Sequence, residues 1–307
     1  MSFPPYTLAT DGALYQGHVL DVLPQLAAES VHCVVTSPPY WGLRKYDIPD
    51  VAFPAGEFIP MAGLPPVAFP AWTGQLGLEP DPLMYTGHMV QVFREVRRVL
   101  RKDATAWVNL GDGWEAKNLI GLPWRVALAL QADGWWLRSE IIWHKPNPMP
   151  SSVKDRPTPA HEQIFLLSRS RRYFFDAVAI QEPAVYCGPP KPGTQAQTAM
   201  TGLKVHTGTL GVATFSRNKR SVWTIPTFPF PSAHFATFPP ALVTPCIKAG
   251  CPSGGVVMDP FGGSGTVAAV ARELGRRWIS VELGAGYCEM HKDRLPKQVQ
   301  ARLEAGA

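Results

Sequence analysis

The stretch Gly254-Gly-Val-Val-Met-Asp-Pro-Phe-Gly-Gly-Ser-Gly-Thr266 (GGVVMDPFGGSGT) joins an apolar run, an acid and a glycine-rich turn in direct succession. The pattern predicts a buried strand that ends at Asp259, a tight loop, and a helix that begins at about Thr266. Glycines in such a loop let the backbone approach a ligand closely. About 20 residues further on, the next predicted strand ends at Glu282, from where a carboxylate reaches ribose hydroxyls. The stretch therefore predicts a nucleoside-cofactor site at the carboxyl ends of parallel strands.

The residues around this loop narrow the choice of cofactor. The loop is not GxxxxGK[ST], and it departs from GxGxxG. Asp259 and Glu282 would repel a pyrophosphate but suit a cation. S-adenosylmethionine fits, because it carries a ribose, an ammonium group and a sulfonium, and Phe261 can add a cation–π or packing contact. The alternative is a glycine-rich turn that binds nothing, which the placement of Glu282 makes less favourable.

The rest of the chain alternates between strand and helix patterns, which is typical of an α/β fold with a mostly parallel sheet and helices on both faces. Helices are predicted at 85–101, 122–133 and 266–274. Strands are predicted at 31–36, 105–110, 136–143, 161–168, 255–259 and 278–282.

A second stretch, Val34–Leu43 (VVTSPPYWGL), ends a strand with two prolines and two aromatic residues. Proline lacks an N–H and forces the preceding residue into extended geometry, so Ser37-Pro38-Pro39 is a stiff corner that offers mainly hydrogen-bond acceptors. Acceptors hold an exocyclic amine of a nucleobase in place and turn its electron density toward an incoming methyl group. Tyr40 can stack on a base that has left its duplex. The alternative is a proline-terminated strand whose aromatic residues pack into the core.

Together, TSPPYW and DPFGGSGT resemble the catalytic and cofactor motifs of the amino-group DNA methyltransferases, which methylate cytosine N4 or adenine N6. The catalytic corner precedes the cofactor loop, which is similar to the permuted beta class of that family. The resemblance implies a Rossmann-like, S-adenosylmethionine-dependent methyltransferase fold with circularly permuted motif order. It implies catalytic roles for Ser37, Pro38, Pro39 and Tyr40. It implies cofactor binding by Asp259, Phe261, Gly262, Gly263, Ser264, Gly265, Thr266, Glu282, Phe238 and Pro239.

The opening element of the chain departs from the family pattern. The family normally has an acid after the glycine of YxGDxxxxL, whereas this sequence has His18 after Gly17. Asp21 lies a little further on, and whether it compensates is left open.

The first residue of the catalytic corner bears on the target base. In this family serine occurs mostly in cytosine-N4 enzymes, and aspartate is commoner in adenine-N6 enzymes. Ser37 therefore favours cytosine N4, with adenine N6 as the alternative, although both side chains can accept from an amine. The expected reaction is direct transfer to the N4 amine of a flipped cytosine.

The basic residues indicate where double-stranded DNA binds. The formal net charge is +5 and the sequence pI is about 9.0, which suits a polyanionic partner. We expect a catalytic domain at 1–182 and 221–307, with a Pro-rich loop at 47–84, and a target-recognition insertion at 183–220. The expected DNA-binding residues of the insertion are Lys204, Arg217, Lys219 and Arg220.

Three rival functions follow from the same residues. A carbon-5 cytosine methyltransferase needs a thiolate nucleophile, but Cys246 lies in an apolar segment that predicts a buried helix. A methyltransferase acting on a protein glutamine or on RNA more often has Asn at the first corner position. A degenerate, non-catalytic nucleic-acid-binding module is weakly favoured by His18 and disfavoured by the intact motifs.

Cysteine spacing and hydropathy bound the remaining possibilities. The five cysteines are scattered without Cys-x-x-Cys spacing, which predicts reduced thiols and no metal site. The start lacks signal-peptide features, and no apolar run approaches the roughly 18–20 residues needed to span a bilayer. We therefore expect a cytoplasmic protein without a membrane partner. The sequence leaves open a bacterial or phage source, a homodimer and a cognate restriction enzyme.

Overall fold

The computed structural model describes residues 4–184, 206–207, 213–227 and 239–294. The chain divides into two compact units. The larger unit comprises Met1–Phe175 and Ser221–Ala307, and the smaller comprises Asp176–Arg220. Lys204 and Phe238, two residues with predicted roles, lie outside the described residues.

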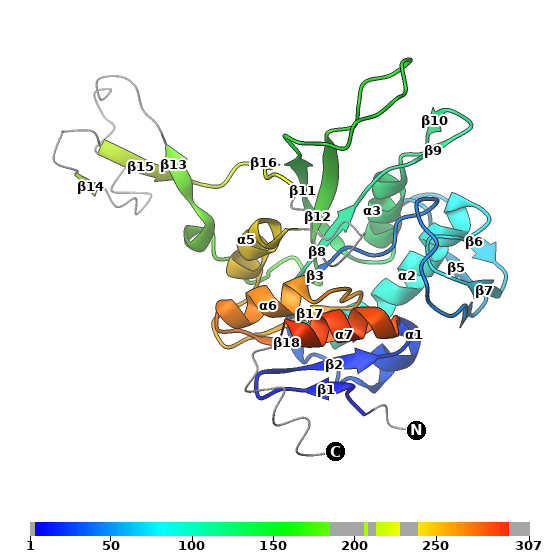
Figure 1. Cartoon of the computed structure of the whole chain (residues 1–307), viewed down its shortest axis with the longest axis horizontal. Helices are drawn as coiled ribbons and strands as arrows, with labels where there is room; N and C mark the ends of the chain where they lie inside the picture. Colours follow the sequence, from blue (N-terminus) through cyan, green and yellow to red (C-terminus); the bar gives the residue numbers. More distant parts are fainter. Residues whose placement is uncertain (1–3, 185–205, 208–212, 228–238, 295–307) are drawn as a thin grey trace. The chain divides into compact units, whose positions relative to one another are not determined.

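The larger unit is built on a nine-stranded sheet among the described residues, in the order β1-β2-β18-β17-β3-β8-β12-β11-β16 (Figure 1). The strands are β1 (Thr7–Leu8), β2 (Gly12–Gln16), β3 (Val31–Thr36), β8 (Leu100–Leu110), β11 (Trp136–His144), β12 (His161–Ser168), β16 (Val222–Thr224), β17 (Val256–Asp259) and β18 (Arg277–Glu282). All neighbours from β2 to β8 pair in parallel, while β12 runs antiparallel to both β8 and β11. The expectation of a mostly parallel sheet is confirmed.

The two strands that carry the sequence motifs are direct neighbours in this sheet. Val257 of β17 pairs with Cys33 of β3 in a parallel register. Because parallel strands end at the same edge, Thr36 and Asp259 lie side by side and the loops after them leave the sheet together. The carboxyl end of β8 and the amino end of the antiparallel β12 reach this edge too, since Leu110 pairs with Gln163.

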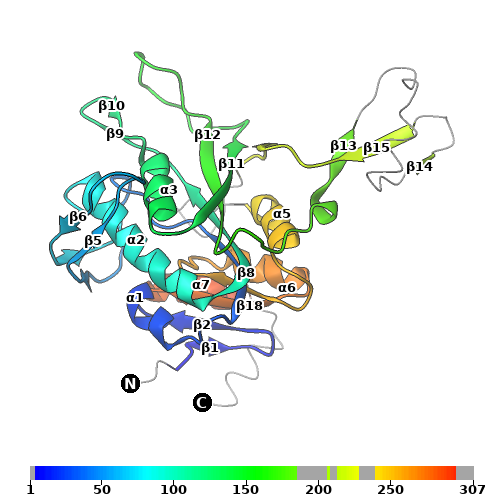
Figure 2. The ribbon, with the colours of Figure 1, turned by 180° about the vertical axis from the view of Figure 1, so that it is seen from behind.

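Helices cover both faces of the sheet, as the opposite views in Figures 1 and 2 show. One face carries α1 (Val19–Val22), η1 (Leu23–Gln25), α2 (Pro82–Val99) and α3 (Leu122–Ala132). Their apolar side chains share a core cluster with Val34 and Met258. The other face carries α5 (Pro240–Gly250), α6 (Thr266–Glu273) and α7 (Ala285–Asp293). Gly250 of α5 lies against Trp107 there.

Helix α2 begins three residues before its predicted start. Asp81 is the N-cap, and its carboxylate accepts from the backbone N–H groups of Leu83 and Met84 at 2.8 and 2.9 Å. Pro82 occupies the first turn, where its missing N–H costs no hydrogen bond. The helix ends at Val99 and β8 starts directly after it, so the predicted strand at 105–110 was too short at its beginning.

The segment 47–84, predicted as a Pro-rich loop, contains four short strands, so that prediction is wrong in part. The strands are β4 (Val51–Phe53), β5 (Gly56–Phe58), β6 (Val67–Phe69) and β7 (Trp72–Gly74). Strand β4 pairs with β7, and β5 with β6, so one hairpin is nested inside the other. Phe53, Phe58 and Phe69 each end a strand and are buried. Burial of these aromatic rings stabilises pairs that are too short to be recognised by periodicity.

The smaller unit contains η2 (Val178–Ile180) and the antiparallel strands β13 (Glu182–Ala184), β15 (Ala213–Arg217) and β14 (His206–Thr207). A further hairpin in the larger unit pairs β9 (Trp114–Glu115) with β10 (Asn118–Leu119). Within the described part of the chain, every helix is too short or too polar to cross a lipid bilayer.

Candidate active site

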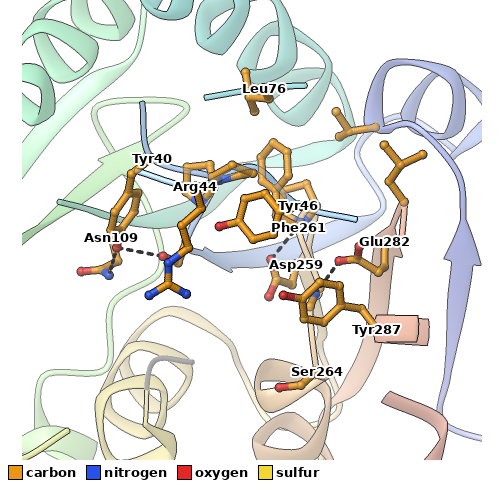
Figure 3. A pocket seen from close by; sticks show the side chains of 18 of the residues that line it. Tyr40, Arg44, Tyr46, Leu76, Asn109, Asp259, Phe261, Ser264, Glu282 and Tyr287 are labelled. Carbon is orange, nitrogen blue, oxygen red and sulfur yellow. Dashed lines mark hydrogen bonds between the residues drawn. The ribbon is translucent and has the colours of Figure 1, made fainter. Parts of the chain in front are cut away.

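A cavity of about 780 Å³ opens at the carboxyl edge of the sheet, around the ends of β3 and β17 (Figure 3). This volume is within the usual range for small-molecule sites. The predicted site residues that line it are Ser37, Pro38, Pro39, Tyr40, Asp259, Phe261, Gly262, Gly263, Ser264, Thr266 and Glu282. The structure thus brings the proline corner and the glycine loop to one cavity.

Other predicted site residues lie elsewhere. Gly265 is not part of the cavity wall; it caps α6 at a φ of +83°, and an added Cβ would lie 2.7 Å from the His291 ring. Pro239 is buried at the start of α5 and does not line the cavity either. The predictions that these two residues bind the cofactor therefore find no support in the described cavity.

The predicted DNA-binding residues that are described lie at the end of the smaller unit. The guanidinium groups of Arg217 and Arg220 both contact Glu182 Oε1, at 2.9 and 2.6 Å, and both side chains are exposed. Two arginines that share one carboxylate retain a net positive charge. Lys219 lies between them in sequence and is partly exposed.

Glu282 is fixed at one end of the cavity by backbone amides. Its Oε2 accepts from Gly263 N at 2.8 Å, and its Oε1 accepts from Gly284 N at 2.7 Å. Burial raises the pKa of this carboxyl group, and the amide hydrogen bonds oppose the rise. Each oxygen keeps a second lone pair for a ligand hydroxyl.

Asp259 lies next to Glu282 and is 2% exposed. Its Oδ1 accepts from Thr36 Oγ1 at 2.7 Å and from Phe261 N at 3.0 Å. Burial raises the pKa of Asp259 to about 7, against the lowering effect of these two hydrogen bonds, and the nearby Glu282 charge adds to the rise. Two crowded, poorly solvated carboxyl groups are a favourable site for a cation.

Aromatic and apolar side chains form the walls between the two carboxyl groups and the sheet edge (Figure 3). Phe261, Tyr46 and Tyr287 line the cavity, and the two tyrosine rings meet edge to face at 6.5 Å. Gln75 fixes the Tyr46 backbone by accepting from Tyr46 N at 3.0 Å and donating to Tyr46 O at 3.1 Å. Flat rings beside carboxylates suit a ligand with a planar base and a charged tail.

His18, which replaces the usual acid of the family, also lines the cavity. It is 8% exposed and contacts Phe53 edge to face at 4.9 Å. Burial lowers the pKa of its imidazole, so the ring is neutral at physiological pH. Asp21 is exposed on α1 outside the cavity wall, and therefore does not replace the missing acid there.

The residues present fit S-adenosylmethionine. Asp259 and Glu282 supply negative charge for its cationic groups, and Glu282 can accept from its ribose. Ser264 Oγ is buried without a hydrogen-bond partner in the cavity wall, which leaves a polar group for a ligand. Gly263 adopts a φ of +48° with open space where a Cβ would stand. No group of His, Cys, Asp or Glu suited to a metal ion occurs in the part of the chain that the structure describes.

The other end of the cavity holds a hydrogen-bonded cluster around Tyr40 (Figure 3). Tyr40 Oη lies 3.0 Å from Ser37 Oγ and 2.9 Å from Glu162 Oε2. Asn109 Nδ2 donates to Tyr40 Oη at 2.6 Å, and Lys145 Nζ forms an ion pair with Glu162 Oε1. The corner is also held from the core side, because the buried Tyr85 hydroxyl donates to Pro39 O at 2.9 Å.

Sequence reasoning missed Asn109 and Glu162. Asn109 is the last polar residue of a predicted strand, and Glu162 is near the start of another. Their only signal was that position, since strand ends at one sheet edge form ligand sites. Lys145, in the predicted loop after a strand, was expected near the cleft, and it does line the cavity.

Cys246 does not belong to this site. It lies inside α5 and is 2% exposed, and its thiol donates to Leu242 O at 3.3 Å. The prediction of a buried helix cysteine is confirmed. A carbon-5 mechanism through this thiol therefore lacks a nucleophile in the cavity.

Comparisons with known proteins agree with the geometry. A family model for N6/N4 DNA methylases matches residues 31–293. The chain is 38% identical to the Type II methyltransferase M.XycI of Xanthomonas campestris pv. cyanopsidis, over 96% of this chain and 91% of the relative. It is 38% identical to M.SmaI of Serratia marcescens, over 91% of this chain and 89% of the relative.

Solved structures share the fold. The PvuII DNA methyltransferase (cytosine-N4-specific) aligns with a TM-score of 0.64 at 19% identity, over 97% of this chain and 93% of that one. A DNA modification methylase of Thermus thermophilus, TTHA0409, complexed with S-adenosyl-L-methionine, aligns with a TM-score of 0.55 at 23% identity, over 93% and 95% of the two chains.

Proposed function

The chain belongs to the N6/N4 DNA methylase family and is an S-adenosylmethionine-dependent DNA methyltransferase, and from that premise we propose that its target is the exocyclic N4 amine of a cytosine flipped out of duplex DNA. The observation that carries the proposal is the shared cavity: Ser37 and the proline corner line the same space as the glycine loop. A base and a methyl donor held there face each other without an intervening element.

S-adenosylmethionine supplies a methyl group already activated by its sulfonium charge. The protein's task is therefore to bind, align and exclude water. Asp259 and Glu282 attract the cationic groups, and Phe261, Tyr46 and Tyr287 wall the planar part. These roles are proposals drawn from the position of each side chain in the cavity.

At the opposite end, Ser37 Oγ and the Pro38 carbonyl accept the two hydrogens of the N4 amine. Accepting both hydrogens orients the nitrogen lone pair out of conjugation with the ring and toward the methyl group. Tyr40 stacks on the extruded ring, a contact that alanine-substitution data value at about 1–3 kcal/mol per base. The methyl transfers directly to nitrogen, with no covalent enzyme intermediate, and the proton leaves afterwards.

The choice of cytosine over adenine rests on Ser37. Serine at the first corner position is mostly found in the cytosine-N4 branch of the family that the motif resembles. A cytosine offers the same amine geometry as adenine in a smaller ring.

DNA is recognised through the smaller unit in this proposal. Arg217, Lys219 and Arg220, with Lys204 outside the described residues, contact phosphates or guanine edges. Exchange of the shared Glu182 contact for a phosphate would keep each guanidinium paired.

Expression in a host without DNA methylation, followed by modification-detecting long-read sequencing and nucleoside mass spectrometry, tests the target base. N4-methylcytosine in a fixed context supports the proposal, whereas N6-methyladenine assigns the alternative base. Ser37→Ala should abolish most turnover while cofactor binding persists, and Cys246→Ala serves as the matched control that keeps activity. Well-folded protein that binds S-adenosylmethionine but modifies no DNA would overturn the proposal.

A further inference from the structure

The hydrogen bonds around Tyr40 restrict the direction of every proton in the cluster. Three polar groups surround the phenol oxygen: Ser37 Oγ at 3.0 Å, Glu162 Oε2 at 2.9 Å and Asn109 Nδ2 at 2.6 Å. A phenol has one hydrogen to donate and two lone pairs to accept with. Three contacts therefore use its full capacity, provided that one is donated and two are accepted.

Glu162 takes the single hydrogen of Tyr40. The ion pair with Lys145 marks Glu162 as a carboxylate, which can only accept. Burial, together with the Glu162 charge, raises the pKa of Tyr40 well above its usual value, so the phenol keeps its proton. The bond between the two side chains hence runs from Tyr40 to Glu162.

Asn109 fills one lone pair of the phenol. Its Nδ2 donates to Tyr40 Oη and, at 2.8 Å, to Glu162 Oε2. The reversed amide orientation would place Oδ1 against the carboxylate, acceptor against acceptor, and is excluded on that ground. Tyr40 has then donated its hydrogen and can only accept from its third neighbour, Ser37.

Ser37 is consequently the donor in its bond to Tyr40, and its only hydrogen is used there. Any contact of its hydroxyl with a base in the cavity must be made with a lone pair. A serine without such a partner rotates freely and can donate or accept. Here the carboxylate two steps away removes that choice.

We propose that Glu162 is a positioning residue that acts through Tyr40 to make Ser37 an obligate acceptor, so that the site selects a base carrying an exocyclic amine and rejects the corresponding oxo base. The inference rests on the proposed binding of the target base beside Ser37. An amine donates two hydrogens and satisfies the Ser37 lone pair. The oxo group of uracil, or of hypoxanthine in place of adenine, presents acceptors to an acceptor and leaves both unpaired.

This function differs from a merely structural one for Glu162. If the carboxylate served only to pair with Lys145, its loss would weaken amino and oxo substrates equally. Under the proposal its loss frees the Tyr40 hydrogen to turn toward Ser37, which releases the Ser37 hydrogen into the cavity. The oxo base then gains a donor while the amino base loses its acceptor.

The test compares two duplexes that carry the mapped recognition sequence and differ only at the target: the amino base against its oxo counterpart. Dissociation constants are measured with S-adenosylhomocysteine present, for the wild type, Glu162→Leu and Tyr40→Phe. Tyr40→Phe keeps the aromatic ring and removes only the hydroxyl. The readout is the ratio of oxo to amino dissociation constants, in which the cost of opening each duplex cancels between proteins.

Asn147→Ala is the matched control. Asn147 lines the same cavity and holds its loop through two hydrogen bonds with Thr227, at 3.1 and 2.9 Å, without contacting the Tyr40 cluster. Its substitution perturbs the wall but leaves the proton directions intact.

The wild type and Asn147→Ala should prefer the amino base by roughly tenfold or more, and both Tyr40→Phe and Glu162→Leu should lower that ratio about tenfold. An unchanged ratio in Tyr40→Phe, or in a folded Glu162→Leu protein, overturns the role of Glu162 while methyl transfer by the wild type still stands. Wild-type protein that methylates no DNA overturns the proposed function together with this inference.

Discussion

Thr36 and Asp259, 223 positions apart in the chain, are joined by a hydrogen bond of 2.7 Å from the threonine hydroxyl to Asp259 Oδ1. Each residue ends a strand of the parallel centre of the sheet, and each is followed directly by one of the two motifs. The bond therefore fixes the proline corner relative to the cofactor loop. It also lowers the pKa of a carboxyl group that burial raises to about 7.

Thr36→Val should weaken cofactor binding without touching the cofactor. The substitution removes the hydroxyl, so the Asp259 pKa rises further. A rise of about one unit would reduce the ionised fraction at pH 7 roughly fivefold, with a similar loss of affinity for a cation. Isothermal titration with S-adenosylmethionine measures the change. Thr36→Ser keeps the hydroxyl and should bind like the wild type, and equal affinities in the valine variant would contradict the coupling.

Cofactor binding should fall with acidity around pH 7. Asp259 in the free protein has a pKa of about 7, and a bound cation stabilises only the ionised form. Below pH 7 binding must expel a proton, so affinity drops up to about tenfold per pH unit, and above pH 8 it levels off. Titrations in two buffers of different ionisation enthalpy should detect proton release near neutrality.

Asp259→Asn separates this effect from other titrating groups of the cavity. Burial raises the pKa of Glu282 and lowers that of His18, so both can add to the profile at lower pH. The variant should bind more weakly overall and lose the component centred near pH 7. Retention of that component would show that Asp259 is not its source.

Glu79→Ala should destabilise the folded segment 47–84 and the corner that it contacts. The buried Glu79 carboxylate accepts from Gly77 N at 2.8 Å and is paired with His88 Nδ1 at 2.9 Å. Gly77 O in turn accepts from Gly42 N at 2.8 Å. Two buried donors without acceptors cost about 2–5 kcal/mol of unfolding free energy together.

Urea denaturation measures that loss, and Glu95→Ala is its control. Glu95 forms a partly exposed ion pair with Arg98 at 2.7 Å on α2, which is worth up to about 1 kcal/mol. Equal unfolding free energies for the two variants would argue against a structural role for the Glu79–His88 pair.

The order of strands and helices could be predicted because each apolar run carries its own boundaries. Val31–Thr36 and His161–Ser168 were predicted with their observed bounds, since a polar or proline residue interrupts the run at each end. The meeting of the two motifs followed from the rule that parallel strands end at one edge. The glycine loop and Glu282 needed only local spacing.

What the sequence could not reveal depends on pairing between distant residues. The strands at 51–53 and 72–74 are three residues long, too short for a period to be read. Asn109, Lys145 and Glu162 converge only because β12 runs antiparallel between β8 and β11. A single polar residue at the end of a strand carries no signal about which neighbour it will meet.

The glycines of the cofactor loop should fail in different ways when substituted. Gly265 has a φ of +83°, and a Cβ there would lie 2.7 Å from the ring of the buried His291. Gly265→Ala should therefore cost about 2–4 kcal/mol of unfolding free energy, from the left-handed backbone and the clash together. Gly263 has a φ of +48° but no atom closer than 4.0 Å to its added Cβ. Gly263→Ala should cost only about 1 kcal/mol, yet it places a methyl group in the cavity wall and should weaken S-adenosylmethionine binding more than its stability loss suggests. Urea denaturation and isothermal titration on both variants measure the two effects. A stable Gly265→Ala protein with impaired binding would instead mean that Gly265, like Gly263, faces the ligand.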